Sequence, residues 1–327
     1  MKAVRYHECG EAEVLRWESI PDPAPGAGEL LIKVEAAGVN YADVMRRSGK
    51  YHFKIDFPAL LGTEAAGTVT KVGPNVTGFS VGDRVFCRTT AAGCQAEMVV
   101  APLSEVFPMP QNLSFIDAAA IPVIFLTAYH MLKTLAPIRQ GETVLIQAAA
   151  SGVGTAAVQM AKAWGARVFA TASNDEKLDL VKKLGADAVI NYQKVDFVAE
   201  IMRLTDGVGV DRVLECVGGE VLTKSIDALA PGGRLMIYGR ASGNLPAIMP
   251  EQLFAKNLHV VGLNIGGKPW TQAIHRAALD EILALVASGK VKPVISETFP
   301  MGHVIQAHKH LSDRKTMGKV ILIPPRA

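Results

Sequence analysis

The feature that most constrains the fold is an alternation of apolar strands and helical segments between residues 121 and 261. The run TVLIQA (143–148) is continuously apolar, as expected of a strand buried on both faces of a parallel sheet. Further strands separated by helical stretches are predicted at 166–172, 188–192, 210–218, 233–239 and 258–264. This order predicts an α/β doubly wound parallel sheet with right-handed crossovers.

The two flanking sections have a different pattern. Residues 1–120 are rich in Gly, Pro and short β-type runs, such as 29–39 and 83–88, and predict a compact, mostly β domain. The tail after residue 261 contains two helical stretches and a final strand at 318–324, and it is too small to fold alone. We therefore expect the tail to complete the first domain, with the parallel-sheet domain inserted.

Composition excludes several classes of protein. Hydrophobic residues make up 49% of the 327-residue chain and charged residues 20%, and the net charge is +3 without a dense Lys/Arg run. These values argue against nucleic-acid binding. The start MKAVRYHECG lacks the apolar region of a secretory signal. The most apolar stretch, Ala118–Leu132, is too short for a bilayer and contains Pro122, so it predicts a buried helix and no membrane insertion. We expect a cytoplasmic protein with reduced cysteines.

The segment QAAASGVGTAAVQMAKAWGA (147–166) follows the first apolar strand and opens an amphipathic helix. The dinucleotide fingerprint G-x-G-x-x-G is represented here by Ala149, Ser151 and Gly154. A helix N-terminus offers free N–H groups and partial positive charge to a pyrophosphate, and Gly152 and Gly154 allow close approach. Ser151 either donates to a phosphate or caps the helix near Gly154, and the two roles are compatible. The segment predicts a dinucleotide site.

The end of the second strand favours NADPH over NADH. Residues 171–174 contain no acidic side chain, whereas an NAD site usually places Asp or Glu there against the ribose 2′-hydroxyl. Asp175 and Glu176 fit instead the first turn of a helix capped by Ser173 or Asn174. Lys177 is within reach of a 2′-phosphate, although a solvated surface lysine is the alternative.

Several motifs together resemble the medium-chain dehydrogenase/reductase superfamily over essentially the full length. They are GVNYADVMRRSGKY (38–51), GTEAAGTV (62–69), VGDRV (81–85), AAAIPVIFLTAYHML (118–132) and ASGVGTAAVQMAKAWGA (150–166). Within it, the chain resembles the zinc-independent quinone oxidoreductases of zeta-crystallin type. The resemblance implies a GroES-like catalytic domain (1–120, completed by 262–327), a Rossmann NADPH domain (121–261) and a cofactor in the cleft between them. It also implies a homodimer formed by edge strands, and the apolar segment 258–264 would be a poor exposed edge.

The resemblance assigns cofactor contacts by motif. Near the nicotinamide it places Thr127 and His130, and at the pyrophosphate Gly152 and Val153, beside Ser151 and Gly154 of the fingerprint. Around the 2′-phosphate it places Ser173, Lys177, Tyr192 and Arg314. At the strand ends it places Cys216, Val217, Tyr238 and Gly239, and at the carboxamide Leu263, Asn264 and Ile265. For Tyr192 simple packing and for Gly239 a turn are the alternatives.

Zinc-dependent relatives carry Cys and His ligands where this chain has Asn40 and Thr63. An amide and a hydroxyl are poor zinc ligands, so no catalytic or structural metal is expected. Glu64 is expected to hold the Asn40 loop as a buried hydrogen-bonding group rather than to act in catalysis. The spacing of the histidines, including His308, suggests surface positions.

Without a metal, hydrogen-bond donors must stabilise charge on the acceptor oxygen. Asn40 can donate through its amide, and Tyr51 and His52 can donate or relay a proton. Asp43 can orient the loop or accept a hydrogen bond from the substrate, and the alternative is that it caps the turn DVMRRSG. A quinone suits this arrangement, because its reduced form is a mild acid. The function expected is hydride transfer from NADPH to a quinone. The alternatives are reduction of the C=C bond of an enone or alkenal, with Tyr51 as the acid, and a non-catalytic NADPH-binding protein.

Overall fold

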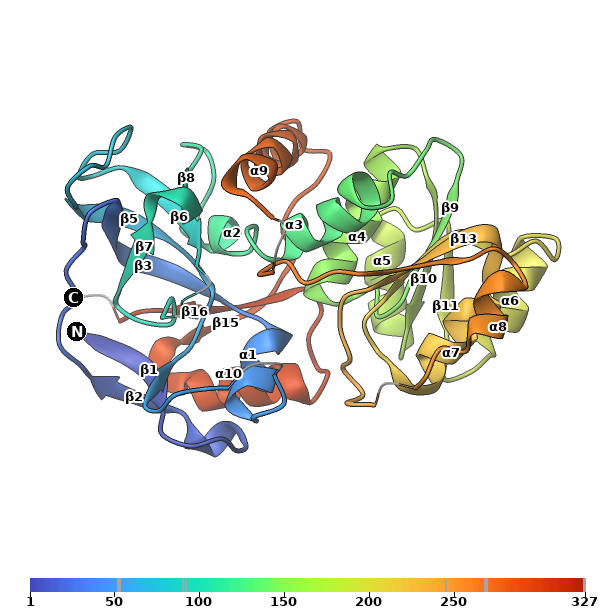
Figure 1. The fold of residues 1–327 in the computed structure, drawn as a ribbon, viewed down its shortest axis with the longest axis horizontal. Coiled ribbons are helices and arrows are strands. Elements are labelled where there is room, and N and C mark those ends of the chain that lie inside the picture. The colour runs from blue at the N-terminus through green and yellow to red at the C-terminus, as the bar shows by residue number, and fades with distance from the viewer. Residues whose placement is uncertain (52–53, 90, 92, 245, 268–269, 326–327) are drawn as a thin grey trace. The chain divides into compact units, whose positions relative to one another are not determined.

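The computed structural model describes residues 1–51, 54–89, 91, 93–244, 246–267 and 270–325. The chain forms two compact units, Met1–Val123 with Pro293–Ala327 (unit 1) and Ile124–Lys292 (unit 2) (Figure 1). Unit 1 is thus built from both ends of the chain. The boundary that the sequence suggested at residue 262 is corrected, because residues 262–292 belong to unit 2 and not to the catalytic domain.

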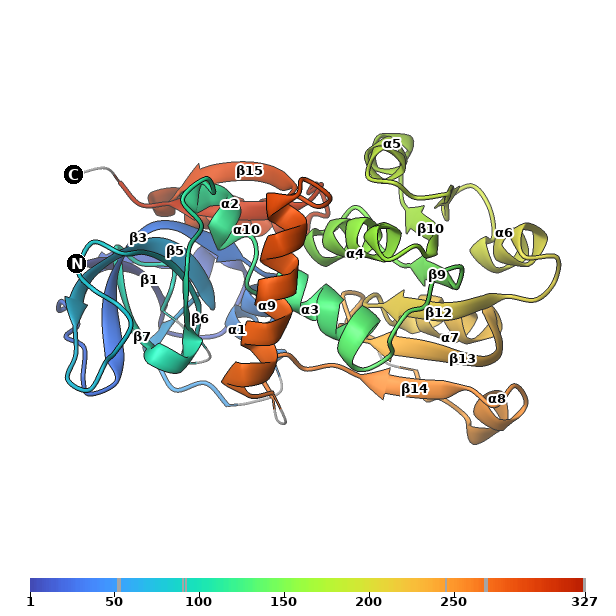
Figure 2. The same ribbon diagram turned by 90° about the horizontal axis from the view of Figure 1, so that it is seen from above.

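Unit 2 contains a six-stranded sheet in which every pair of neighbouring strands is parallel. Its strands are β9 (Thr143–Ile146), β10 (Arg167–Ala172), β11 (Ala188–Asn191), β12 (Val210–Glu215), β13 (Leu229–Ile237) and β14 (His259–Gly262). Their order is β11-β10-β9-β12-β13-β14, and Figure 2 shows β10, β9, β12, β13 and β14 following one another across the sheet. The strand order reverses between β9 and β12, which is the point where such sheets bind ligands. The predicted doubly wound sheet is confirmed.

Among the described residues, five helices connect these strands, and all of them except α8 bury apolar side chains. They are α4 (Gly152–Ala163), α5 (Asp175–Lys183), α6 (Phe197–Leu204), α7 (Gly219–Asp227) and α8 (Pro250–Phe254). Helix α4 packs on β9 and β10, α5 on β10 and β11, and α7 on β12 and β13. Leu145, Phe169 and Val213 from the strands and Leu222 from α7 meet in one fully buried core. The continuous apolar runs in the sequence reflect this burial on both faces.

The apolar stretch 118–132 is not the single buried helix that the sequence suggested. It is divided between α2 (Phe115–Ala119) and α3 (Ile124–Tyr129), and a π-helical turn, η3 (His130–Thr134), follows. Pro122 lies between the two helices, and a proline cannot supply the N–H that a continuous helix needs there. In the described parts of the chain, no helix has both the length and the apolar character required to cross a membrane.

Side-chain hydrogen bonds explain why residues 262–292 join unit 2. The segment contains α9 (Gln272–Ala287), which packs on α3. The Glu281 carboxylate on α9 accepts from the Tyr129 hydroxyl (2.7 Å) and from the Trp164 indole N–H (3.1 Å). The Gln159 amide on α4 exchanges two hydrogen bonds, each of 3.0 Å, with the backbone of Lys292. These half-buried polar contacts attach α9 and the residues after it to the helices that precede them.

Unit 1 is mostly β, as predicted. Its larger, seven-stranded sheet has the order β15-β16-β3-β5-β6-β8, with β7 also paired to β3. These strands are β3 (Glu29–Val39), β5 (Glu64–Val72), β6 (Arg84–Arg88), β7 (Met98–Pro102), β8 (Val106–Pro108), β15 (Ile295–Pro300) and β16 (Lys319–Ile323). A smaller sheet joins β2 (Arg16–Ser19), β1 (Lys2–Tyr6) and β4 (Ala59–Leu60). Strand β16 runs antiparallel to β3 with Val320 opposite Val39, so Lys319 is brought to the end of β3.

Two helices of unit 1 enclose an unexpected buried histidine. Helix α1 (Tyr41–Arg47) packs against α10 (Val304–Ser312). His308 on α10 is completely buried, which corrects the surface position expected from its spacing. Neither ring nitrogen has a hydrogen-bond partner among the described residues. Burial and the nearby Arg47 guanidinium lower the pKa of His308 to about 3, so the ring is neutral in the fold at neutral pH.

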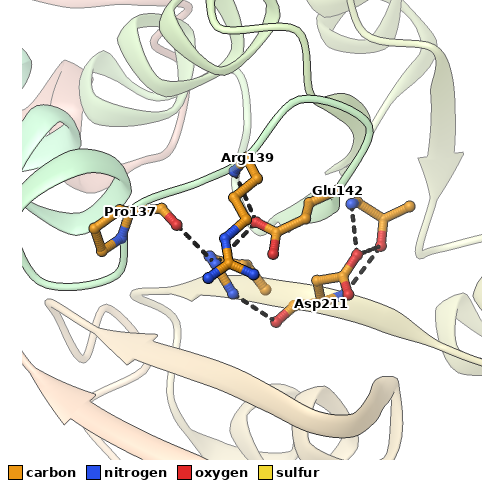
Figure 3. A network of polar contacts seen from close by, with 6 residues as sticks. Pro137, Arg139, Glu142 and Asp211 are labelled. Atoms are coloured by element: carbon orange, nitrogen blue, oxygen red, sulfur yellow. Dashed lines mark hydrogen bonds and ion pairs between the residues drawn. The ribbon is translucent and has the colours of Figure 1, made fainter.

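A polar network ties together the amino ends of β9 and β12 in unit 2 (Figure 3). The Arg212 guanidinium donates to the Glu142 carboxylate (2.9 Å) and to the Pro137 carbonyl (2.9 Å). The Asp211 carboxylate accepts from both the backbone N–H and the hydroxyl of Thr143 (2.7 Å each). Because the network lies at the amino ends of these strands, it belongs to the supporting scaffold and not to the ligand-binding edge.

Candidate functional site

The carboxyl edge of the six-stranded sheet gathers most of the residues predicted to bind the cofactor. Each strand is followed within a few residues by one or more of them. They are Ser151, Gly152, Val153 and Gly154 after β9, Ser173 after β10, Tyr192 after β11, Cys216 and Val217 after β12, Tyr238 and Gly239 after β13, and Leu263, Asn264 and Ile265 after β14. Since parallel strands end at the same edge of a sheet, these residues share one side of unit 2.

The loop after β9 is shaped by its backbone. Helix α4 begins at Gly152, and the Ser151 hydroxyl oxygen accepts the Gly154 N–H (3.1 Å), which confirms the predicted cap. Its own O–H stays available to donate, so a phosphate contact remains a prediction. A Cβ at Gly154 would lie 2.5 Å from the Ala149 carbonyl oxygen and 2.6 Å from that of Ala148. The last glycine of the fingerprint is therefore required by close packing.

The first acidic residue after β10 is Asp175, on the first turn of α5. Asn174 is the cap of α5, because its side-chain oxygen accepts the Lys177 N–H (2.9 Å). The Asp175 carboxylate binds the Lys194 ammonium (2.6 Å) and the Asn191 amide (2.9 Å), and these partners lower the pKa of Asp175. The first carboxylate after β10 is thus bound to residues at and after the end of β11, while Ser173 and Lys177 are half-buried.

Thr127 and His130 come from α3 and η3, before β9. Thr127 is buried, and His130 is completely buried. The two ring nitrogens of His130 lie 2.9 Å from the Thr134 hydroxyl and 3.0 Å from Nδ1 of His275, and the ring stacks on Trp270 with centroids 4.2 Å apart. His275 and Trp270 were not singled out from the sequence. This cluster links η3 to α9, and a direct contact of His130 with the nicotinamide remains a prediction.

In unit 1, three buried polar residues from distant parts of the chain meet beyond the end of β3. The Asn40 amide N–H donates to Glu64 Oε1 (2.7 Å), and the Lys319 ammonium donates to Asn40 Oδ1 (2.6 Å). Lys319 also forms an ion pair with Glu64 Oε1. Glu64 Oε2 accepts the Val123 N–H (2.7 Å), so both carboxylate oxygens are bound. The expected role of Glu64 in holding the Asn40 loop is confirmed.

Asp43 lies beside this network. Its Oδ2 accepts the Asn40 backbone N–H (2.9 Å) and the Gln95 amide N–H (3.3 Å), so the predicted capping role is confirmed. Asp43 is completely buried, and this burial raises its pKa to about 6. Tyr51 follows α1, with the Arg46 guanidinium 5.3 Å from its ring centroid. His52, the other proton donor considered, lies outside the described residues. A catalytic part for Asp43 or Tyr51 stays a prediction.

Arg314 is placed in unit 1, in the turn after α10. It is exposed and has a left-handed backbone with φ of 58°. The other residues expected around the 2′-phosphate, Ser173, Lys177 and Tyr192, all belong to unit 2. The contact of Arg314 with a 2′-phosphate therefore stays a prediction.

The residues at the position of the zinc site do not suit a zinc ion. Asn40 Oδ1 already accepts from an ammonium and its Nδ2 donates to a carboxylate, so a cation bound there would face the Lys319 charge. No group of three or more metal-binding side chains occurs within the described ranges. Lys319 was not singled out from the sequence. The available signal was a lysine opening the apolar strand GKVILIP, where a buried charge requires a partner.

Known proteins match the chain in both units. The family model for the alcohol dehydrogenase GroES-like domain matches residues 26–111, and that for zinc-binding dehydrogenase matches residues 152–281. Quinone oxidoreductase of Rattus norvegicus is 35% identical, covering 99% of this chain and 98% of its own length. Escherichia coli quinone oxidoreductase, solved with NADPH, has a TM-score of 0.95 and 33% identity, covering 99% of this chain and all of its own. The enoyl reductase CurK has a TM-score of 0.89 and 31% identity, with 99% of each chain covered.

Proposed function

Because the chain belongs to the medium-chain dehydrogenase/reductase superfamily, in its quinone oxidoreductase type, we propose that it is an oxidoreductase that reduces a quinone with NADPH. The observation that carries the quinone assignment is the Asn40 amide. It is held between a buried ammonium and a buried carboxylate where zinc-dependent relatives carry a metal ligand. This arrangement provides a neutral hydrogen-bond donor in place of a metal.

The carboxyl edge of the unit 2 sheet fits NADPH. The N-terminus of α4 offers N–H groups and partial positive charge to a pyrophosphate, and Gly154 keeps the helix close to β9. At the end of β10 the Asp175 carboxylate is bound to Lys194 and Asn191, so it does not repel a 2′-phosphate. Lys177 on the first turn of α5 supplies positive charge there. When bound, NADPH supplies the hydride.

The unit 1 network supplies what the acceptor needs. Asn40 donates an amide N–H to the acceptor oxygen on which negative charge develops. Hydride transfer turns a quinone into the hydroquinone monoanion, which needs one proton to complete the reduction. Because a hydroquinone is a mild acid, this proton can come from water and no dedicated acid is compulsory. The neighbouring Asp43 is bound to the Asn40 backbone and is placed to keep the loop in register.

A second candidate function is reduction of an activated C=C bond. The similarity to the enoyl reductase CurK favours it, and it would require a positioned proton donor, for which Tyr51 is the candidate. A third candidate is a protein that binds NADPH without turnover.

One experiment separates the three. NADPH oxidation is followed by absorbance with an ortho-quinone and an enone as parallel acceptors, and NADH serves as the cofactor control. Turnover with the quinone and a preference for NADPH are expected. Turnover with the enone alone moves the assignment to a double-bond reductase, and NADPH binding without any turnover moves it to a binding protein.

The outer strand β14 also supports a homodimer formed through residues 258–264. It is the last strand of the sheet, and its Val260 side chain is 37% exposed. Met249 and Phe254, from the segment that leads into β14, are 54% and 68% exposed. Exposed apolar strands at sheet edges favour pairing with another chain. A dimeric mass by light scattering is expected for the wild type and a monomeric mass for Val260→Lys; a monomeric wild type at micromolar concentration rules the dimer out.

A further inference from the structure

We propose that Lys319 is a positioning residue of the hydride-transfer site, which fixes the direction in which the Asn40 amide points. This proposal rests on the proposed function for its kinetic consequence, but its structural content is independent of any acceptor. Lys319 lies on the last strand of the chain and contacts Asn40 across a separation of 279 residues. No motif that carries the family resemblance includes it.

The chemistry of the three groups determines the amide orientation. An ammonium can only donate hydrogen bonds, and an ionised carboxylate can only accept them. The oxygen of the Asn40 amide must therefore face Lys319 (2.6 Å), and its nitrogen must face Glu64 (2.7 Å). A rotation of the amide by half a turn would set an N–H against the ammonium and an oxygen against the carboxylate. One N–H of Asn40 Nδ2 donates to Glu64. Among the described residues, the second N–H of Nδ2 has no hydrogen-bond acceptor.

Lys319 also makes the remaining N–H a stronger donor. A cation bonded to an amide oxygen draws electron density toward that oxygen, and linked hydrogen bonds polarise one another in surroundings of low dielectric. Lys319 is 2% exposed and Glu64 is 0% exposed, so water does not screen this effect. The acceptor oxygen thus meets an oriented and polarised N–H. The charges of Lys319 and Glu64 cancel, so no net charge is added to the site.

The surrounding backbone is arranged to keep the pair in place. The antiparallel register of β16 with β3 sets Lys319 next to Asn40, and the Val123 N–H holds Glu64 Oε2. Gly38 on β3 provides the space for the carboxylate, because a Cβ there would lie 2.8 Å from Glu64 Cδ. A buried ion pair adds little net stability compared with apolar residues of similar volume. Orientation of Asn40 accounts for the pair better than stability does.

The test removes both charges together so that neither remains buried alone. The variant Glu64→Gln/Lys319→Met is compared with Asn40→Ala and with the triple variant. The matched control is Glu142→Gln/Arg212→Met, which neutralises the ion pair between buried Arg212 and half-buried Glu142 at the amino ends of β9 and β12 (Figure 3). We expect kcat to fall about 10²-fold in the Lys319 variant, as when one donor to a developing oxyanion is lost, with KM for NADPH unchanged. The control keeps the wild-type kcat.

The triple variant decides whether Lys319 acts through Asn40. If it does, the triple variant has the same kcat as Asn40→Ala, because nothing remains to be positioned. The proposal is overturned if the fold-decreases in kcat of Asn40→Ala and of Glu64→Gln/Lys319→Met multiply in the triple variant. It is also overturned if Glu64→Gln/Lys319→Met keeps the wild-type kcat. The absence of wild-type turnover with every acceptor would instead overturn the proposed function.

A second readout needs no turnover. In protein labelled with ¹⁵N-asparagine, the Asn40 side-chain signal is assigned by its loss in Asn40→Asp. The wild type is expected to show one strongly downfield, slowly exchanging amide proton, bonded to Glu64, and one ordinary proton. This difference is expected to disappear in Glu64→Gln/Lys319→Met. Two ordinary amide protons in the wild type overturn the proposal, even if the double variant fails to fold.

Discussion

The two units build their polar sites in opposite ways. In unit 2 the carboxyl edge of the sheet is formed by consecutive loops, and the decisive contacts belong to the backbone, such as the α4 N-terminus and the close approach of Gly154. In unit 1 the network is formed by the side chains of Asn40, Glu64 and Lys319, which come from three separate segments. We therefore expect unit 1 to be most affected by substitutions that remove a charge, and unit 2 by substitutions that add even one methyl group beside its backbone.

The largest effect should come from leaving one buried charge unpaired in unit 1. Lys319→Met leaves the completely buried Glu64 without its cation and is expected to destabilise the protein by about 3–5 kcal/mol. Arg212→Met leaves Glu142 without its cation, but Glu142 is 21% exposed and can be hydrated. The loss of unfolding free energy in Arg212→Met should therefore be smaller. Urea unfolding of both variants measures the difference. Equal losses would show that burial of the carboxylate does not distinguish the two ion pairs.

The next effect tests the backbone of unit 2. Gly154→Ala places a methyl group against two carbonyl oxygens and is expected to cost up to about 3 kcal/mol, as overpacking does, and to weaken NADPH binding. Gly302→Ala is the matched control, because its Cβ would meet only Trp17, at an ordinary 3.7 Å. Thermal unfolding and fluorescence titration with NADPH provide the measurements. Unchanged NADPH affinity in Gly154→Ala would contradict the close-approach argument.

A third effect concerns pH and belongs to unit 1. The pKa of His308 is lowered from 6.5 to about 3, so its contribution to stability is complete above pH 6.5 and is lost as the pH falls toward 3. The pKa of Asp43 is raised from 3.8 to about 6, so its contribution to stability increases as the pH falls from 6 to 3.8. The effects of His308 and Asp43 on the pH dependence of the unfolding free energy therefore partly cancel in the wild type. When His308 is replaced, only the effect of Asp43 remains.

His308→Leu should therefore gain about 2 kcal/mol in unfolding free energy relative to the wild type between pH 6.5 and pH 5. Urea unfolding at the two pH values measures this gain, and the exposed His303→Leu is the control. A stability difference between variant and wild type that does not vary with pH would contradict the buried, neutral state of His308.

The smallest effect is the helix cap in unit 2. Ser151→Ala removes the acceptor of the Gly154 N–H and is expected to cost about 1 kcal/mol of stability. If the hydroxyl also donates to a phosphate, NADPH affinity falls in the same variant, whereas a pure cap leaves the affinity nearly unchanged. Calorimetric titration with NADPH separates the two roles of Ser151.

The same contrast explains which parts could be predicted from the sequence. The unit 2 strands appeared as continuous apolar runs, because burial on both faces leaves a local signal such as TVLIQA. The cap at Ser151 was equally local. Lys319 and its partners could not be found in this way, since their proximity depends on the pairing of β16 with β3. His308 was misplaced because a single polar residue in a short helix does not reveal which face is buried.

Contacts across long sequence separations also caused the error at residue 262. The sequence pattern predicts the helix α9, but its attachment to unit 2 depends on Glu281 meeting Tyr129 and Trp164, more than a hundred residues earlier. The break at Pro122, by contrast, has a local signal, because a proline cannot supply the N–H that a continuous helix needs.

The insertion of unit 2 into unit 1 has a consequence for biosynthesis. A ribosome completes the continuous unit 2 segment, Ile124–Lys292, before it makes β15 and β16, so unit 2 can fold while unit 1 still lacks two strands. Until Lys319 emerges, Glu64 has no cation and the end of β3 has no neighbour at that edge. The nascent chain thus acquires its nucleotide-binding half first, and the group that orients Asn40 is added only after it.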